Sequence, residues 1–175
     1  MGASGWAYFV PYQTDTFKAL QELREATFQR GGYYQRPPFW RDMTFEDFLP
    51  PEPSLTDEEK ADDLAEFQKL HALPEPTSIE TLIQWNAEDG THSIIDISEI
   101  APIAGFGAAA PLSSEELKRF FVTDKPTRAM IESKERDLGR FLQQDMGRYR
   151  YEATYIIVYK DGEPAEIYFT GYSGD

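Results

Sequence analysis

The sequence predicts an α+β fold in which four or five helices pack on a small antiparallel sheet. Residues 151–172 carry two runs of β-branched and aromatic residues on either side of Asp161-Gly162, which is typical of a β-hairpin. A lone hairpin is only marginally stable in water, so it needs further strands and covering helices. Strand candidates at residues 6–10 and 93–97, together with several amphipathic stretches, supply both.

Length and composition predict one globular domain over residues 1–175. Hydrophobic residues make up 41% of the chain, enough for a core that buries roughly two thirds of the unfolded surface. No apolar run approaches the ~20 residues of a membrane span, and the first residues lack the basic and apolar regions of a signal peptide. We therefore expect a cytoplasmic protein that does not contact membranes.

The residue types restrict the chemistry that this chain can perform. It has no cysteine, which excludes disulfides, zinc-thiolate sites, iron–sulfur clusters and cysteine nucleophiles. It has two histidines, His71 and His92, too few for a site that needs several imidazoles. We expect no cofactor and no metal centre.

The charge balance predicts the kind of partner. Seventeen basic and thirty-one acidic residues give a net charge of −14. Such a surface repels phosphate backbones, so we expect no direct nucleic-acid binding and favour a basic protein as the partner. The alternative, that the charge only keeps the protein soluble, stays open.

The first half of the chain predicts a strand, a helix and a long ordered loop. Residues 6–10 are aromatic and end at a proline, which suits an edge strand. Thr14 or Asp15 can cap a helix that Gly31-Gly32 ends. Residues 33–53 then interleave prolines with aromatic rings and show no helical or strand period.

This aromatic and proline-rich loop at about residues 33–53 has two interpretations. Its rings can cover the core, as long loops commonly do. Alternatively, exposed Trp and Arg residues anchor protein interfaces, which makes Trp40 and Arg41 candidate partner-binding residues.

The next helix is predicted by a capping box at Thr56 and Glu59. Residues 44–66 hold nine acids and the single base Lys60, so the acidity is concentrated here. The apolar stripe is thin, which indicates a surface helix with its acidic side in water. Together with Trp40 and Arg41, the candidate partner-binding residues are Asp57, Glu58, Glu59, Asp62, Asp63 and Glu66.

The second half of the chain predicts a short helix from a capping box at residues 77–80, then a buried strand at residues 92–97. Gly105 to Ala110 match the dinucleotide pattern G-x-G-x-x-A, but Pro111 follows where the motif requires a helix to begin, so we reject nucleotide binding there. Helices are expected from Ser113 and over residues 127–144, before the hairpin.

A catalytic centre is not indicated. Asp89, His92 and Asp96 are close in sequence, but as strand residues His92 and Asp96 would lie about 13 Å apart on one face. Tyrosines of the hairpin, such as Tyr155 and Tyr168, offer a second option, a tyrosine-lined pocket with Asp89 and His92.

Two functional hypotheses follow. The first is an acidic protein-binding module, such as an immunity-type inhibitor or antitoxin, that captures a basic partner. The alternative is a small-ligand binder or an enzyme that uses the pocket near His92. The first does not require an enzyme, and the sequence leaves the oligomeric state open.

Overall fold

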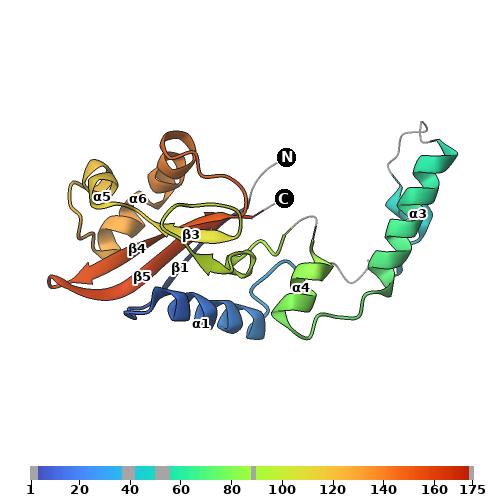
Figure 1. Ribbon diagram of the computed structural model, residues 1–175, viewed down its shortest axis with the longest axis horizontal. Coiled ribbons are helices and arrows are strands. Elements are labelled where there is room, and N and C mark those ends of the chain that lie inside the picture. Colours follow the sequence, from blue (N-terminus) through green and yellow to red (C-terminus); the bar gives the residue numbers. More distant parts are fainter. Residues whose placement is uncertain (1–3, 37–41, 50–55, 88–89, 174–175) are drawn as a thin grey trace.

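The structure is a computed structural model that describes residues 4–36, 42–49, 56–87 and 90–173. A five-stranded sheet with the order β1-β5-β4-β3-β2 forms its centre (Figure 1). The strands are β1 (Gly5–Pro11), β2 (Glu99–Ile100), β3 (Ala108–Pro111), β4 (Glu152–Lys160) and β5 (Glu163–Tyr172). The helices among the described residues are α1 (Thr16–Gln29), α2 (Phe45–Phe48), α3 (Asp57–Ala72), α4 (Ile79–Trp85), α5 (Ser114–Phe121) and α6 (Arg128–Arg140).

The sheet is mixed, so the prediction of an α+β fold is confirmed but that of an antiparallel sheet is only partly right. β5 pairs antiparallel with β1 and with β4, whereas β3 runs parallel to both β4 and β2. The parallel β3–β4 pair requires a crossover, which α5 and α6 provide. The helices outnumber the expected four or five because α2 forms inside the predicted loop, where Thr44 and Asp47 make a capping box.

The hairpin predicted at Asp161-Gly162 is confirmed. β4 and β5 pair along their lengths, from Ala153 opposite Gly171 to Lys160 opposite Glu163. Asp161 and Gly162 both have positive φ, 53° and 87°. Positive φ at both central residues is the geometry of a type I′ turn, whose twist matches that of the flanking strands.

The predicted strand at residues 93–97 is wrong. Ile94–Asp96 form a 3-10 helix, η2, because the Ser93 hydroxyl accepts a hydrogen bond from the backbone N–H of Ile95 and caps the turn. His92 has φ 53°, which a β-strand does not allow. The strand that pairs with β4 is instead β3, which begins at Ala108. The two glycines of the G-x-G-x-x-A stretch are therefore followed by a strand and not by a helix.

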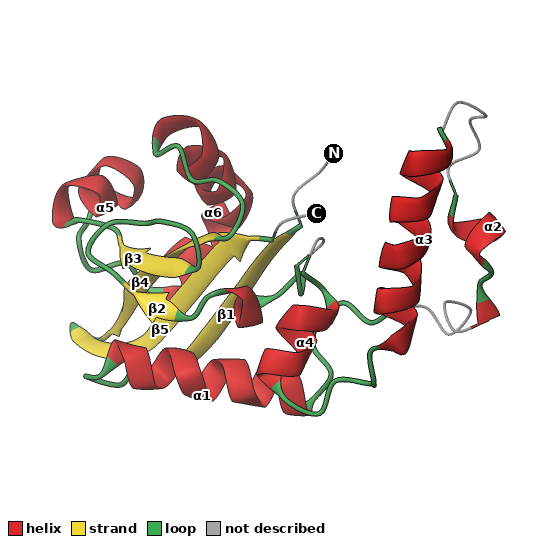
Figure 2. Cartoon of the chain, turned by 45° about the vertical axis from the view of Figure 1, so that its right-hand side comes forward, coloured by secondary structure: helices red, strands yellow, loops and turns green. Residues whose placement is uncertain are grey.

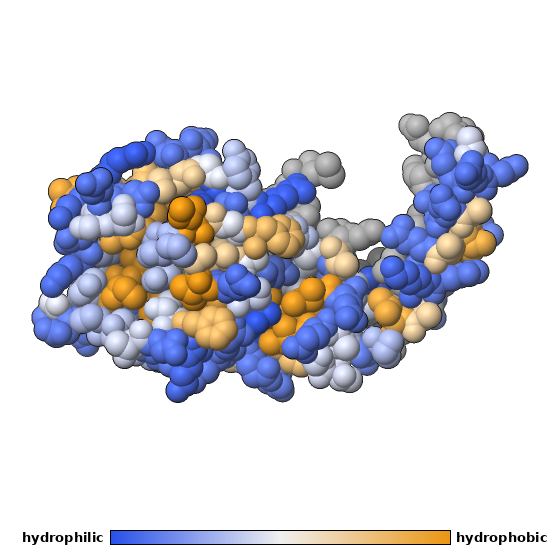
Figure 3. All heavy atoms as spheres, in the orientation of Figure 1, coloured by the Kyte–Doolittle hydropathy of each residue, from blue (hydrophilic) through white to orange (hydrophobic). Residues whose placement is uncertain are grey.

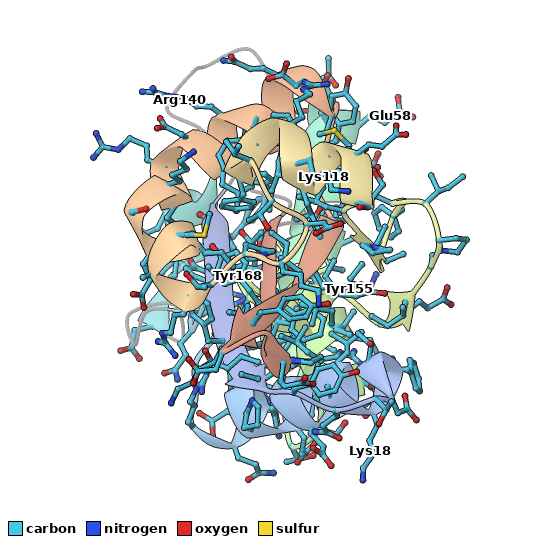
Figure 4. All side chains as sticks on the ribbon, turned by 90° about the vertical axis from the view of Figure 1, so that its left-hand side faces the viewer. Lys18, Glu58, Lys118, Arg140, Tyr155 and Tyr168 are labelled. Carbon is cyan, nitrogen blue, oxygen red and sulfur yellow. The ribbon has the colours of Figure 1, made fainter. Side chains whose placement is uncertain are left out.

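Helices cover both faces of the sheet (Figure 2). One face packs on α1 through Ala19, Leu20 and Leu23, which meet Trp6 and Phe169. The opposite face packs on α5 and α6, and its buried residues include Leu117, Phe121, Ile131, Leu138, Ile156, Val158 and Tyr168. Figure 4 shows this layering: Lys118 of α5 and Arg140 of α6 lie on one side of the strands, and Lys18 of α1 on the other.

α6 continues into a π-helical turn, η3 (Phe141–Asp145), where the sequence predicted one regular helix over residues 127–144. Phe141 and Leu142 of this turn are buried against the sheet. α2 and α3 stand apart from this body and pack on each other (Figure 2). We call the described residues of this projection, 42–49 and 56–72, the acidic arm.

Candidate functional site

The acidic arm owes its main helix to the capping box that the sequence predicted. The Thr56 hydroxyl accepts from the backbone N–H of Glu59 at 3.3 Å, and the Glu59 carboxylate accepts from the backbone N–H of Thr56 at 2.7 Å. These bonds from Thr56 hold the pKa of Glu59 below its usual range. Acidic residues in the first turn also interact favourably with the positive end of the helix dipole, so their negative charges stabilise α3 without help from the sheet.

The predicted partner-binding acids of α3 face solvent. Asp57, Glu58, Glu59, Asp62 and Glu66 are exposed and Asp63 is half-buried. None of the six forms an ion pair with a residue of the described part of the chain. Figure 3 shows the surface of α3 as mostly hydrophilic. The arm therefore presents a row of carboxylates without cationic partners in this chain.

A small apolar contact holds the arm together. The ring centroid of Phe67 on α3 lies 5.7 Å from the ring centroid of Phe45 on α2 and 3.9 Å from that of the His71 imidazole. Leu64 of the same helix is 37% exposed. Trp40 and Arg41 lie outside the described residues, so their role as anchors stays a prediction.

The second predicted site, around His92, is a tight polar turn in the body of the protein. Gly90 and His92 both have positive φ, 71° and 53°. The hydroxyls of Thr91 and Ser93 lie 2.9 Å apart, and both side chains are buried. The His92 ring stacks on Tyr34 at 4.9 Å between centroids. This stack and the turn fix the histidine beside η2 instead of in a strand.

Asp96 is the ionisable group at the centre of this turn. Its Oδ1 accepts from the backbone N–H of Thr91 at 2.8 Å. Its Oδ2 is enclosed and has no hydrogen-bond partner among the described residues, and the same holds for the nearby Ser173 hydroxyl. Burial raises the pKa of the Asp96 carboxyl, and the hydrogen bond from the Thr91 N–H and the charge of His92 oppose this only in part.

A cavity of about 440 Å³ opens beside this turn. Its lining is mostly apolar, and Asp96 contributes the charged group. Phe106 and Tyr151 form one wall, with ring centroids 4.9 Å apart. We call this cavity the Asp96 pocket, and its lining residues are Ile83, Asn86, Ala87, Gly90, Asp96, Phe106 and Tyr151. Figure 3 shows hydrophobic residues gathered beside α4, the helix that contributes Ile83.

The structure does not bring Tyr155 and Tyr168 together. Tyr155 pairs with Phe169 and packs on the α1 face, whereas Tyr168 pairs with Ile156 and is buried on the α5 and α6 face. In Figure 4 the labelled side chains of Tyr155 and Tyr168 come from the two strands of the hairpin, β4 and β5. Neither tyrosine lines the Asp96 pocket, and Asp89 lies outside the described residues.

Sequence reasoning missed the two rings that do line the pocket. Tyr151 immediately precedes β4 and has φ 60°, a left-handed backbone conformation that no sequence pattern here predicts. Phe106 is 83% exposed and sits between Gly105 and Gly107. A large apolar residue between two glycines is unusual for a core residue, and this was the sequence signal that could have pointed to Phe106 as a surface binding residue.

The turn is not arranged as a nucleophile and base. His92 Nε2 has no hydrogen-bond partner in the described part of the chain, so no hydroxyl there is placed to give it a proton. Residues 4–36, 42–49, 56–87 and 90–173 contain no group of three or more His, Cys, Asp or Glu side chains that would hold a metal ion. What the pocket offers is binding: apolar walls, two rings and one carboxyl.

Comparisons with protein-family models, with curated proteins and with solved structures find no match to this chain. None of the helices that the structure describes combines the length and apolar character needed to cross a bilayer. The fold and the two surfaces define a mixed α+β protein with a projecting acidic helix and a cavity that joins aromatic rings to a buried carboxyl.

Proposed function

We propose that this protein is a protein-binding module that captures a basic partner through the acidic arm. The observation that carries the proposal is the position of α3, which packs on α2 and stands apart from the sheet (Figure 2). None of the described side chains of α3 belongs to the core of the body, so this helix is free to be covered by another protein.

The charge of the arm favours a basic partner. The six acids of α3 lack cationic partners among the described residues, and like charges on one helix repel each other. A partner with clustered Lys or Arg residues relieves that repulsion, and long-range attraction speeds its association. Leu64 and the half-buried Phe67 supply apolar contact area between the charges.

An inhibitor of the immunity or antitoxin type is the finer form of this proposal. Such proteins block a basic target by covering it, which requires an acidic surface and no catalytic chemistry. In the His92 turn, no hydroxyl of the described residues forms a hydrogen bond with His92 Nε2, which is compatible with a role that needs no catalysis.

The test compares two variants with the same change of charge. The arm variant replaces Asp57, Glu58, Asp62 and Asp63 by their amides and leaves Glu59 to cap the helix. The control replaces four exposed acids of the body by glutamine, and these are Glu25, Glu99, Glu115 and Glu163. Wild type and both variants are immobilised, and proteins captured from lysate of the source cells are quantified by mass spectrometry.

The expected result is one basic protein that the wild type and the control capture and the arm variant does not. Its association rate should fall steeply as salt rises, since the attraction is between exposed charges. Equal capture by both variants, a partner without excess basic charge, or no specific partner at all would each contradict the proposal. Circular dichroism of the arm variant checks that α3 is still helical.

A further inference from the structure

The Asp96 pocket has the size of a small-molecule site and lies in the body, apart from the acidic arm. Its volume of about 440 Å³ falls within the ~300–1,000 Å³ of pockets that enclose a small ligand. Three elements or turns converge on it: Ile83 comes from α4, Asp96 from η2, and Tyr151 from the entrance of β4. It is therefore built by packing of the body and not by a single loop.

The aromatic wall is held in place by unusual backbone geometry. Phe106 is 83% exposed, yet its ring rests on Tyr151 and does not fold into the core. Tyr151 has φ 60° and Gly107 has φ 73°, and the backbone N–H of Gly107 donates to the carbonyl of Tyr151 at 2.7 Å. Left-handed backbone at an aromatic residue is uncommon and persists where the surroundings impose it.

The charge in the pocket has no counter-ion of its own. No basic side chain of the described residues forms an ion pair with Asp96. Arg24, the buried base whose charge acts on Asp96, donates instead to the carbonyl of Ile95 at 3.1 and 3.3 Å. A buried carboxylate whose Oδ2 lacks a hydrogen-bond partner among the described residues is unfavourable unless a positive charge approaches it.

Every feature of this lining favours a cation with a flat apolar body. Phe106 and Tyr151 offer ring faces, which stack on planar groups and attract cations. Ile83 and Ala87 offer apolar surface, and Asp96 offers the negative charge. The net charge of −14 attracts cations and repels anions from the whole molecule.

We propose that the Asp96 pocket binds a small organic cation, an amine that carries an aromatic ring. The ring of the ligand packs between Phe106, Tyr151 and the apolar wall, and its ammonium group is drawn to the carboxylate of Asp96. Asn86, the C-cap of α4, also lines the site; it is buried and donates to the carbonyl of Tyr34 at 3.3 Å. This site is independent of the acidic arm.

The test uses three probes of nearly the same shape on the full chain. The probes are 2-phenylethylamine, the neutral 2-phenylethanol and the anionic phenylacetate. Binding is followed by chemical-shift changes in two-dimensional amide NMR spectra, with Gly90, Asp96 and Tyr151 as reporters. We expect the amine to shift these amides in a saturable way, the alcohol to bind at least about tenfold more weakly and the anion not at all, since about 1.4 kcal/mol of charge interaction is a tenfold change.

Two variants and one control locate the site. Asp96→Asn keeps the shape and removes the charge, so it should make the amine bind no better than the alcohol. Phe106→Ala removes an exposed ring that the fold does not need, and it should weaken both probes at least about fivefold, because stacking contacts contribute about 1 kcal/mol. Ile103→Ala is the control, because Ile103 is 77% exposed in the same loop and does not line the pocket.

Three results would overturn the proposal: no saturable shift with the amine, equal affinity for amine and alcohol in the wild type, or unchanged affinity in Phe106→Ala. The last variant keeps the test decisive even if Asp96→Asn perturbs the turn. Neutralising the acids of the arm should leave the affinity for the amine within about twofold, so failure of this site and failure of partner capture are separate outcomes.

Discussion

Gly171 lies where the two longest strands meet Trp6, and replacing it by alanine should destabilise the protein. A methyl group there would stand 2.5 Å from the Trp6 ring and 2.7 Å from the carbonyl oxygen of Glu152. Carbon atoms pack best at about 3.5–4.0 Å, so both neighbours would have to move by about 1 Å. Trp6 is 7% exposed and the Glu152 carbonyl belongs to β4, so neither can move cheaply.

Overpacking of this kind costs about 1–3 kcal/mol. For a chain of 175 residues each kcal/mol lowers the melting temperature by about 2–4 °C. Urea denaturation of wild type and Gly171→Ala, followed by far-ultraviolet circular dichroism, measures the difference in the free energy of unfolding. The matched control is Gly105→Ala, because a methyl group at Gly105 meets no atom within 4 Å and its φ is not positive.

A double-mutant cycle separates the two contacts of the new methyl group. In a Trp6→Phe background the ring atoms that it would strike are gone, so Gly171→Ala should cost less there than in the wild type. Stability of Gly171→Ala within about 0.5 kcal/mol of Gly105→Ala would refute the reasoning, because it would mean that the sheet and Trp6 yield without loss.

Three further predictions concern the arm, the hairpin turn and the buried carboxyl. Thr56→Ala should reduce the helicity of α3, measured by circular dichroism, but leave the melting temperature of the body unchanged in calorimetry. Ser113→Ala breaks the same kind of capping box on the packed helix α5, so it should lower that melting temperature by the equivalent of about 1 kcal/mol. Equal effects of the two substitutions on the melting temperature would show that α3 is coupled to the body. Gly162→Ala should cost about 1–2 kcal/mol in urea denaturation, because φ 87° is unfavourable for an L-residue, and a neutral result would contradict the type I′ turn. Burial raises the pKa of Asp96, so the folded state holds its proton more tightly than the unfolded chain; the resulting stabilisation is present below the usual carboxyl pKa and is lost as the pH rises through the raised value. Asp96→Asn cannot ionise, so its free energy of unfolding relative to wild type should increase as the pH rises above the usual carboxyl pKa, and a constant difference would argue against the buried charge.

Local signals in the sequence predicted the elements that local chemistry determines. Asp161-Gly162 predicted the hairpin because positive φ at both positions suits those two residues. Thr56 and Ser113 predicted the starts of α3 and α5, because the capping bonds join residues three apart in sequence. In each case the determining atoms lie within one turn of chain.

One error arose where a distant contact decides the structure, and another where a local side-chain hydrogen bond was overlooked. Ala108 to Pro111 have low strand propensity, and their pairing with Glu152 to Tyr155 makes them a strand. Residues 93–97 look like a buried strand because they are apolar, but the Ser93 hydroxyl turns the chain into η2. The η2 turn also brings His92 close enough for its charge to act on Asp96, whereas in an extended strand the two residues would be too far apart.

The candidate site was therefore only partly predictable. His92 pointed to the right region, yet the lining rings Phe106 and Tyr151 come from segments about 45 residues apart in sequence and meet only in the folded protein. Tyr155 and Tyr168 were misleading because two tyrosines on paired strands share a pocket only if the register places them on one face, and here they do not. The register is a tertiary property, which the tyrosine spacing alone does not reveal.

The position of β5 between β1 and β4 has a kinetic consequence during synthesis. Trp6 pairs with Gly171 and Gly5 with Tyr172, so β1 has no strand to pair with until the ribosome has made the chain through Tyr172. Until then the aromatic residues of β1, and the face of α1 that packs on the sheet, are exposed to solvent or to chaperones. The body should consequently fold only after translation has passed β5, and a ribosome stalled within α6 should hold a chain that proteases cleave readily.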